Sequence, residues 1–134
     1  MDRIEVLIID EHSAVCQALA SRLDAVGSIR VVGATCDFAE GKRVAQRAHP
    51  DVTLIELKTR GCGKDCRQAL DPLLAISELI ASGSGSIVVL TSYLDENEQA
   101  VALGAGAKRY LLKDIDTVGL VNEIEQVARG RLVA

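Results

Sequence analysis

Short apolar runs alternate along this chain with longer stretches in which apolar residues recur at helical spacing. Short runs that are apolar throughout are typical of strands buried on both faces of a parallel sheet. The sequence predicts such strands at Ile4–Ile9, Arg30–Ala34, Asp51–Glu56, Ser86–Thr91 and Lys108–Leu112.

Helices are predicted between these strands and after the last of them. Asp37 is followed three residues later by Glu40, which is the spacing of a capping box. Asp71 stands before Pro72, as an N-cap stands before a proline at the first helical position. An alternative interpretation starts this third helix at Asp65 and bends it at Pro72. The predicted helices cover residues 13–27, 37–48, 71–83, 95–104 and 117–129.

The strict alternation of strand and helix indicates the fold class. Strands joined by helices run parallel through right-handed crossovers, so these elements form a doubly wound sheet. We expect a flavodoxin-like (βα)5 fold, an α/β fold with a parallel five-stranded sheet of order 2-1-3-4-5. A chain of 134 residues is long enough to bury one core, so residues 1–134 are interpreted as a single domain.

Composition narrows the classes of partner. The chain has 15 basic and 19 acidic residues, a net charge of −4, whereas nucleic-acid-binding surfaces are usually basic. Two tyrosines and one phenylalanine leave few aromatic rings on which bases could stack. No apolar run approaches the roughly 18 residues of a membrane span, and the N-terminus lacks a signal-peptide pattern. We therefore expect a cytoplasmic protein that binds neither nucleic acid nor membrane.

Polar side chains stand where the predicted strands leave the core. Asp10 and Glu11 follow the first strand, Glu56 ends the third, Thr91 ends the fourth and Lys113 follows the fifth. Each of them, taken alone, is explained as the exit of a strand from the core. The carboxyl ends of parallel strands share one edge of the sheet, and ligands of such folds bind there. We therefore expect these side chains to lie together.

With these residues in place, the chain resembles the receiver domain of two-component response regulators. The resemblance rests on the pair Asp10-Glu11 and on residues 50–56, 87–92 and 104–114, and it extends over residues 4–130. It is greatest for receivers attached to helix-turn-helix output domains.

The resemblance implies a role for each residue at the edge. Asp10 and Glu11, with Glu56, would form an acidic pocket that holds Mg²⁺. The residue at position 56 would accept a phosphoryl group from a histidine kinase, and Thr91 and Lys113 would contact that group. Mg²⁺ and a lysine suit this chemistry, because phosphoryl transfer requires that charge be neutralised.

The chain departs from the family at the phosphoacceptor, which is aspartate in the family and Glu56 here. The extra methylene moves the carboxylate by about 1.5 Å, whereas catalytic geometry tolerates roughly 0.5 Å. Three hypotheses follow for Glu56. It mimics the phosphorylated state, it marks an inactive site in a structural receiver, or it is still weakly phosphorylated. We favour the first two hypotheses, in which signalling does not depend on phosphorylation.

Two more residues acquire roles beside this site. In the family, Tyr110 would turn inward as Thr91 moves; the alternative is a packing residue with its hydroxyl at the surface. Lys58, two residues after Glu56, is a candidate pocket cation that pairs with Glu56 or Asp10 in place of Mg²⁺. The alternative for Lys58 is a solvated loop lysine.

The long segment 58–70 contains Cys62 and Cys66. A thiol redox pair or a metal-responsive sensor is one hypothesis, and two ordinary surface thiols is the other, since a zinc site needs four ligands. Cys16 and Cys36 are predicted to be small apolar fillers.

The expected function is that of a signalling receiver without enzymatic activity, which regulates an output such as transcription through protein contacts. The expected partners are a histidine kinase, an output domain or another regulator, and a homodimer is a further expectation. No cofactor is expected beyond a weakened Mg²⁺ site. The chain is either a stand-alone receiver or the N-terminal part of a longer regulator.

Overall fold

The computed structural model describes residues 3–58 and 70–133, with residues 129–133 described by their backbone alone. It contains a sheet of five parallel strands in the order β2-β1-β3-β4-β5, which confirms the predicted flavodoxin-like doubly wound fold. The elements are β1 (Ile4–Ile9), α1 (Ser13–Asp24), β2 (Ile29–Thr35), α2 (Phe38–Ala48), β3 (Val52–Ile55), α3 (Pro72–Ala81), β4 (Ser86–Thr91), α4 (Glu96–Ala105), β5 (Arg109–Leu112) and α5 (Thr117–Val133).

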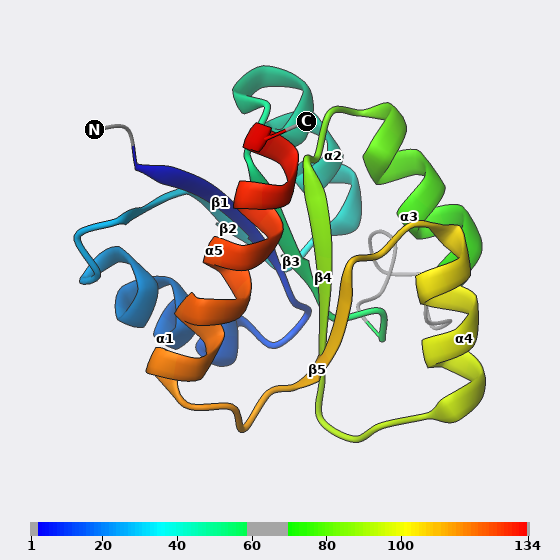
Figure 1. Ribbon diagram of the computed structural model, residues 1–134. Coiled ribbons are helices and arrows are strands. Elements are labelled where there is room, and N and C mark those ends of the chain that lie inside the picture. The colour runs from blue at the N-terminus through cyan, green and yellow to red at the C-terminus, as the bar shows by residue number, and fades with distance from the viewer. Residues whose placement is uncertain (1–2, 59–69, 134) are drawn as a thin grey trace.

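The sheet separates two hydrophobic cores, and β1 contributes to both. Successive side chains of a strand point to opposite faces, so Leu7 and Ile9 enter one core while Val6 and Ile8 enter the other. Figure 1 shows α1 and α5 on one face of the sheet and α2, α3 and α4 on the opposite face. This two-sided burial explains why the strand is apolar at almost every position.

Capping residues begin the helices where the sequence predicts. The Asp37 carboxylate accepts a hydrogen bond from the Glu40 backbone N–H at 3.0 Å. Asp71 caps α3 in the same way, and α3 begins at Pro72; the alternative start at Asp65 lies outside the described residues. These caps satisfy N–H groups that have no partner within the helix.

The last helix is longer than predicted. We expected it to end at Arg129, before Gly130, but α5 continues to Val133. A glycine inside a helix costs only about 1 kcal/mol relative to alanine, so it weakens a helix without necessarily ending it. None of the helices in the described parts of the chain combines the length and the apolar character needed to cross a bilayer.

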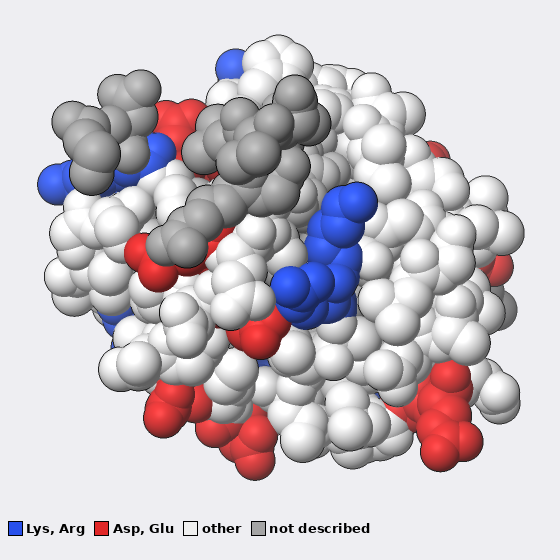
Figure 2. Space-filling view, in the orientation of Figure 1, with Lys and Arg blue, Asp and Glu red and all other residues white. Residues whose placement is uncertain are grey.

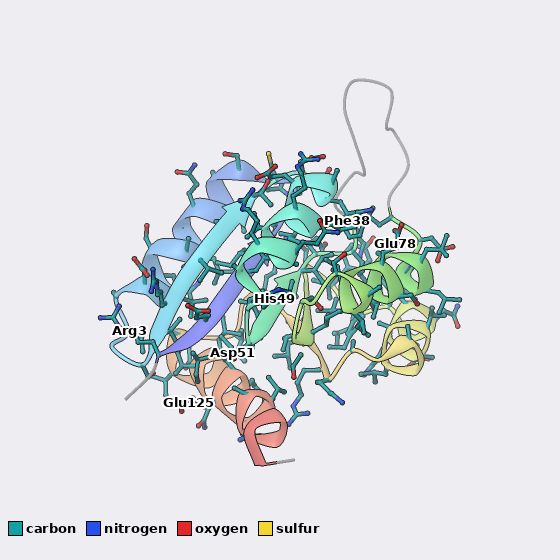
Figure 3. The ribbon with its side chains drawn as sticks, turned by 90° about the horizontal axis from the view of Figure 1, so that it is seen from above. Arg3, Phe38, His49, Asp51, Glu78 and Glu125 are labelled. Atoms are coloured by element: carbon teal, nitrogen blue, oxygen red, sulfur yellow. The ribbon has the colours of Figure 1, made fainter. Side chains whose placement is uncertain are left out.

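The amino edge of the sheet, seen from above in Figure 3, fixes the start of β3. The Asp51 carboxylate accepts a hydrogen bond from the Glu5 N–H at 2.9 Å, which ties β3 to β1. His49 has a left-handed backbone with φ of 47° and ends α2. Gly83 packs against it, because a Cβ at Gly83 would lie 2.6 Å from His49 Nδ1. These contacts set the register that delivers Glu56 to the opposite edge.

Candidate functional site

Four polar residues meet at the carboxyl edge of the sheet, the lower edge in Figure 1. Asp10, Glu56 and Lys113 directly follow β1, β3 and β5, and Thr91 is the last residue of β4. Backbone hydrogen bonds join them in pairs of neighbouring strands: Glu56 N–H donates to Ile9 at 3.0 Å, and Lys113 N–H donates to Thr91 at 2.8 Å. The pairing of the strands therefore places these residues together, independently of any contact between their side chains.

Asp10 and Lys113 form a close ion pair within this edge. Lys113 Nζ lies 2.6 Å from Asp10 Oδ2, and their side chains are 16% and 5% exposed. The other oxygen, Oδ1, accepts a hydrogen bond from the His12 N–H at 2.9 Å. Both oxygens of the Asp10 carboxylate are therefore engaged by groups of the chain itself.

Glu56 is buried and only partly satisfied. The residue is 3% exposed, and its Oε2 has no hydrogen-bond partner among the described residues. Burial raises the pKa of the Glu56 carboxyl, and although Lys113 and Lys58 oppose this shift, Asp10 adds to it. The charged form of Glu56 is thus disfavoured in the folded protein.

Lys58 is placed differently from both expectations. It is neither a freely solvated loop lysine nor paired with Glu56 or Asp10: its Nζ donates a hydrogen bond to Thr91 Oγ1 at 3.1 Å and lies 3.7 Å from Glu98 Oε1. A lysine side chain has four flexible carbons, so its direction is set by the nearest acceptors and not by its distance in sequence from Glu56.

Tyr110 and Glu98 extend the site towards α4. Tyr110 is 7% exposed, and its hydroxyl donates a hydrogen bond to Glu98 Oε1 at 2.7 Å. Burial and this hydrogen bond raise the pKa of Tyr110. Tyr110 is thus a packing residue of one core whose hydroxyl is engaged by Glu98, and the inward turn that the family implies stays a prediction. Sequence analysis missed Glu98 at this site, since its only signal is its position three residues after Asp95, which is the spacing of a capping box.

The contacts of Asp10 weaken it as a Mg²⁺ ligand. Mg²⁺ requires several oxygen ligands in nearly ideal octahedral geometry, but Lys113 and His12 already occupy both oxygens of Asp10. Among the described residues, no group of three or more acidic, histidine or cysteine side chains is placed to hold a metal ion. A Mg²⁺ site formed by Asp10, Glu11 and Glu56 therefore stays a prediction, weakened by the ion pair of Asp10 with Lys113.

The cysteines divide into buried, exposed and undescribed ones. Cys62 and Cys66, the candidate redox pair, lie outside the described residues. Cys16 is buried as predicted, and burial, with a smaller contribution from Asp10, raises its pKa to about 11. Cys36 is exposed, so the prediction that it fills the core was wrong; it lies just after β2, where the chain leaves the sheet.

Comparison with known proteins decides the family. The family model described as the response regulator receiver domain matches residues 6–125. The chain belongs to this family. The receiver is 33% identical over 133 residues to the transcriptional regulatory protein LiaR of Bacillus subtilis (strain 168), a match that covers 95% of the receiver and 57% of LiaR. It is 30% identical over 128 residues to the nitrate/nitrite response regulator protein NarL of Escherichia coli (strain K12), covering 96% and 56% of the two chains.

The receiver therefore spans a little over half of the length of these curated relatives. Among solved structures, it is similar to the signal receiver domain of a response regulator named NarL from Mycobacterium tuberculosis, with a TM-score of 0.81 and 22% identity over 97% of this chain and 99% of that one. This likeness concerns the fold, which it shares almost from end to end.

Proposed function

We propose that this receiver regulates an output through protein contacts and does so without phosphorylation at position 56. The observation that carries the proposal is the state of Glu56, whose carboxyl is buried with Oε2 unpartnered among the described residues. The lysine at this edge, Lys113, is held at 2.6 Å by Asp10. Phosphoryl transfer depends on positioning and on neutralised charge, and this arrangement supplies little of either to Glu56.

The protonation of Glu56 bears on which hypothesis is favoured. A carboxylate attacks phosphorus as an anion, and burial raises the pKa of the Glu56 carboxyl, which favours the neutral acid. Even when it is ionised, this carboxyl carries one negative charge, whereas a phosphoryl group carries roughly two. Both points support an inactive acceptor over a charge mimic.

The proposed output is transcription, exerted through a protein partner. The relatives named above are regulatory proteins longer than this chain, which supports an output domain or a second regulator as the partner. A histidine kinase and a second copy of the receiver are the other proposed partners. On the face shown in Figure 2, basic side chains occur in small separate groups among acidic and uncharged residues, which favours a protein over nucleic acid.

Intact mass spectrometry after incubation with Mg²⁺ and a small-molecule phosphodonor tests the proposal. The wild-type protein and Glu56→Asp are compared, because the variant restores the side-chain length that phosphotransfer requires. We expect the wild-type mass to be unchanged. A gain of one phosphoryl group by Glu56→Asp would then show that the length of residue 56 is the block.

Two other results are informative. If neither protein gains mass, the edge has lost the ability to support the reaction as a whole, and phosphorylation independence is supported more strongly. If the wild-type protein gains a phosphoryl group that is lost in Glu56→Gln, the proposal is wrong and Glu56 is a working acceptor.

A further inference from the structure

Lys58 joins side chains that belong to three different parts of the chain. Its Nζ donates a hydrogen bond to Thr91 Oγ1 at 3.1 Å, lies 3.7 Å from Glu98 Oε1, and stands 4.3 Å from the centroid of the Tyr93 ring. A hydroxyl, a carboxylate and an aromatic face all attract an ammonium group. The side chain therefore connects the segment after β3 to the end of β4, to the β4–α4 loop and to α4.

Glu98 carries this connection on to Tyr110. Its Oε1 is the atom that faces Lys58 and also the atom that accepts the Tyr110 hydroxyl hydrogen at 2.7 Å. The same hydroxyl oxygen accepts a hydrogen bond from the Asp95 N–H at 3.4 Å. Tyr110 is thus held from both sides, by the side chain of Glu98 and by the backbone at the start of α4.

The hydroxyl of Thr91 both donates and accepts in these contacts. It donates to the carbonyl oxygen of Tyr93 at 3.0 Å and accepts from Lys58. Thr91 is completely buried, and a hydroxyl has one hydrogen to donate. An added anionic group could accept a hydrogen bond from Thr91 only if Thr91 released the carbonyl oxygen of Tyr93 in the β4–α4 loop.

The pair of Lys58 and Glu98 is better shielded than ordinary surface ion pairs. Their side chains are 28% and 15% exposed, whereas in the pair of Lys42 and Glu78 they are 31% and 52% exposed. Exposed pairs contribute little, but removing one partner of a shielded pair leaves the other charge uncompensated. Loss of Lys58 should therefore disturb Glu98 and, through it, Tyr110.

We propose that Lys58 and Glu98 form an internal ion pair that holds Thr91 and Tyr110 in one arrangement without covalent modification. The pair thereby keeps the β4–α4 loop, with Tyr93 60% and Leu94 53% exposed, in a constant position for a protein partner. This inference rests on the proposed phosphorylation-independent function and assigns the residues that maintain the signalling state.

Hydrogen–deuterium exchange and tyrosine NMR test the role of Lys58. In Lys58→Met, we expect the amides of residues 92–98 to exchange at least about tenfold faster than in the wild type, because the loop loses its connection to the sheet edge. The ring signals of Tyr110 should shift as well. The chain has two tyrosines, so Tyr93→Phe assigns their signals. Lys58→Arg retains the charge and should preserve the wild-type behaviour.

Lys42→Met is the matched control. Lys42 pairs with Glu78 at 3.5 Å and stands 5.2 Å from the centroid of the Phe38 ring, so it makes the same kinds of contact on α2 and α3, where Figure 3 labels Phe38 and Glu78. We expect this variant to leave residues 92–98 and Tyr110 unchanged.

Two results would overturn the inference. One is an unchanged exchange rate and unchanged Tyr110 signals in Lys58→Met. The other is an equal acceleration in Lys58→Met and Lys42→Met, which would mean a general loss of stability. Glu98→Gln, which keeps an acceptor for Tyr110 but removes the ion pair, should also loosen the loop. The exchange and NMR samples contain no phosphodonor. Phosphorylation of the wild type in the separate mass-spectrometry experiment would contradict the proposed function, but it would not alter the results expected for Lys58→Met.

Discussion

Lys113 Nζ lies 2.6 Å from Asp10 Oδ2, so the lysine of the sheet edge is bound to the first carboxylate of the site, while Glu56 Oε2 has no hydrogen-bond partner in the described part of the chain. Of these two buried carboxyls, Asp10 has described partners at both oxygens, whereas Glu56 has one oxygen without a described partner. This difference determines how the two acidic residues should respond to substitution and to pH.

Lys113→Met should destabilise the fold by about 2 kcal/mol. The substitution leaves the buried Asp10 carboxylate without its cation; the loss stays below the 3–5 kcal/mol of a fully buried pair because Lys113 keeps some solvent contact. Urea unfolding measures the effect. Adding Asp10→Asn should recover most of the stability, whereas Arg43→Met, which removes an exposed pair with Glu40, should change it by less than about 1 kcal/mol. Equal losses in both lysine and arginine variants would contradict this account.

Glu56→Gln should stabilise the receiver increasingly as the pH rises. The folded-state pKa of Glu56 lies above its ordinary value of 4.5. Between these two values the folded protein binds more protons at Glu56 than the unfolded chain does, so this residue makes stability fall as pH rises. Urea midpoints of both proteins at about pH 5 and about pH 8 provide the comparison. A difference between them that does not vary with pH would show that Glu56 ionises normally.

Gly41→Ala should destabilise the fold by about 1–3 kcal/mol, the range for overpacked cores. Gly41 lies in α2 against β1, and an added Cβ would lie 2.8 Å from Ile9 Cγ1. Gly104 in α4 is the matched helical control, since nothing lies within 4 Å of an added Cβ there. Gly104→Ala should stabilise by up to about 1 kcal/mol through helix propensity. Thermal unfolding of the two variants tests both signs.

Thiol alkylation should distinguish Cys36 from Cys16. In a Cys62→Ser/Cys66→Ser background, Cys36 is exposed and should react rapidly, whereas Cys16 is buried with its pKa raised to about 11. The thiolate is the reactive form, so Cys16 should react only as the protein unfolds. Mass spectrometry of the native protein should show one label, followed by a second in denaturant. Rapid labelling of both in the native state would contradict the burial of Cys16.

The fold was predictable because its signals are local. Each residue from Val6 to Ile9 is buried on one face of the sheet or the other, and Asp37 caps a helix three residues from its partner. Such patterns involve residues that are close together in the sequence. The alternation of strands and helices along the chain then determines the order of the strands. The length of α5 was mispredicted because a glycine inside a helix costs only about 1 kcal/mol relative to alanine, so Gly130 does not by itself end the helix.

The site was less predictable because its contacts depend on side-chain direction. The spacing of Glu98 from the helix-capping Asp95 was visible, but its hydrogen bond with Tyr110 requires that α4 and β5 lie side by side. Lys58 stands two residues from Glu56, yet its ammonium turns to Thr91. Sequence spacing gave the set of candidate groups, and only the folded arrangement shows which of them pair.

Helix α4, which lies wholly within the described residues, has Ala102 as its one buried side chain. Val101 and Leu103 on either side of it are 43% and 42% exposed. Most positions of this helix can therefore change with little cost to the core, because substitutions away from buried contacts are usually nearly neutral. The sequence of α4 can thus drift while the scaffold beneath it stays the same.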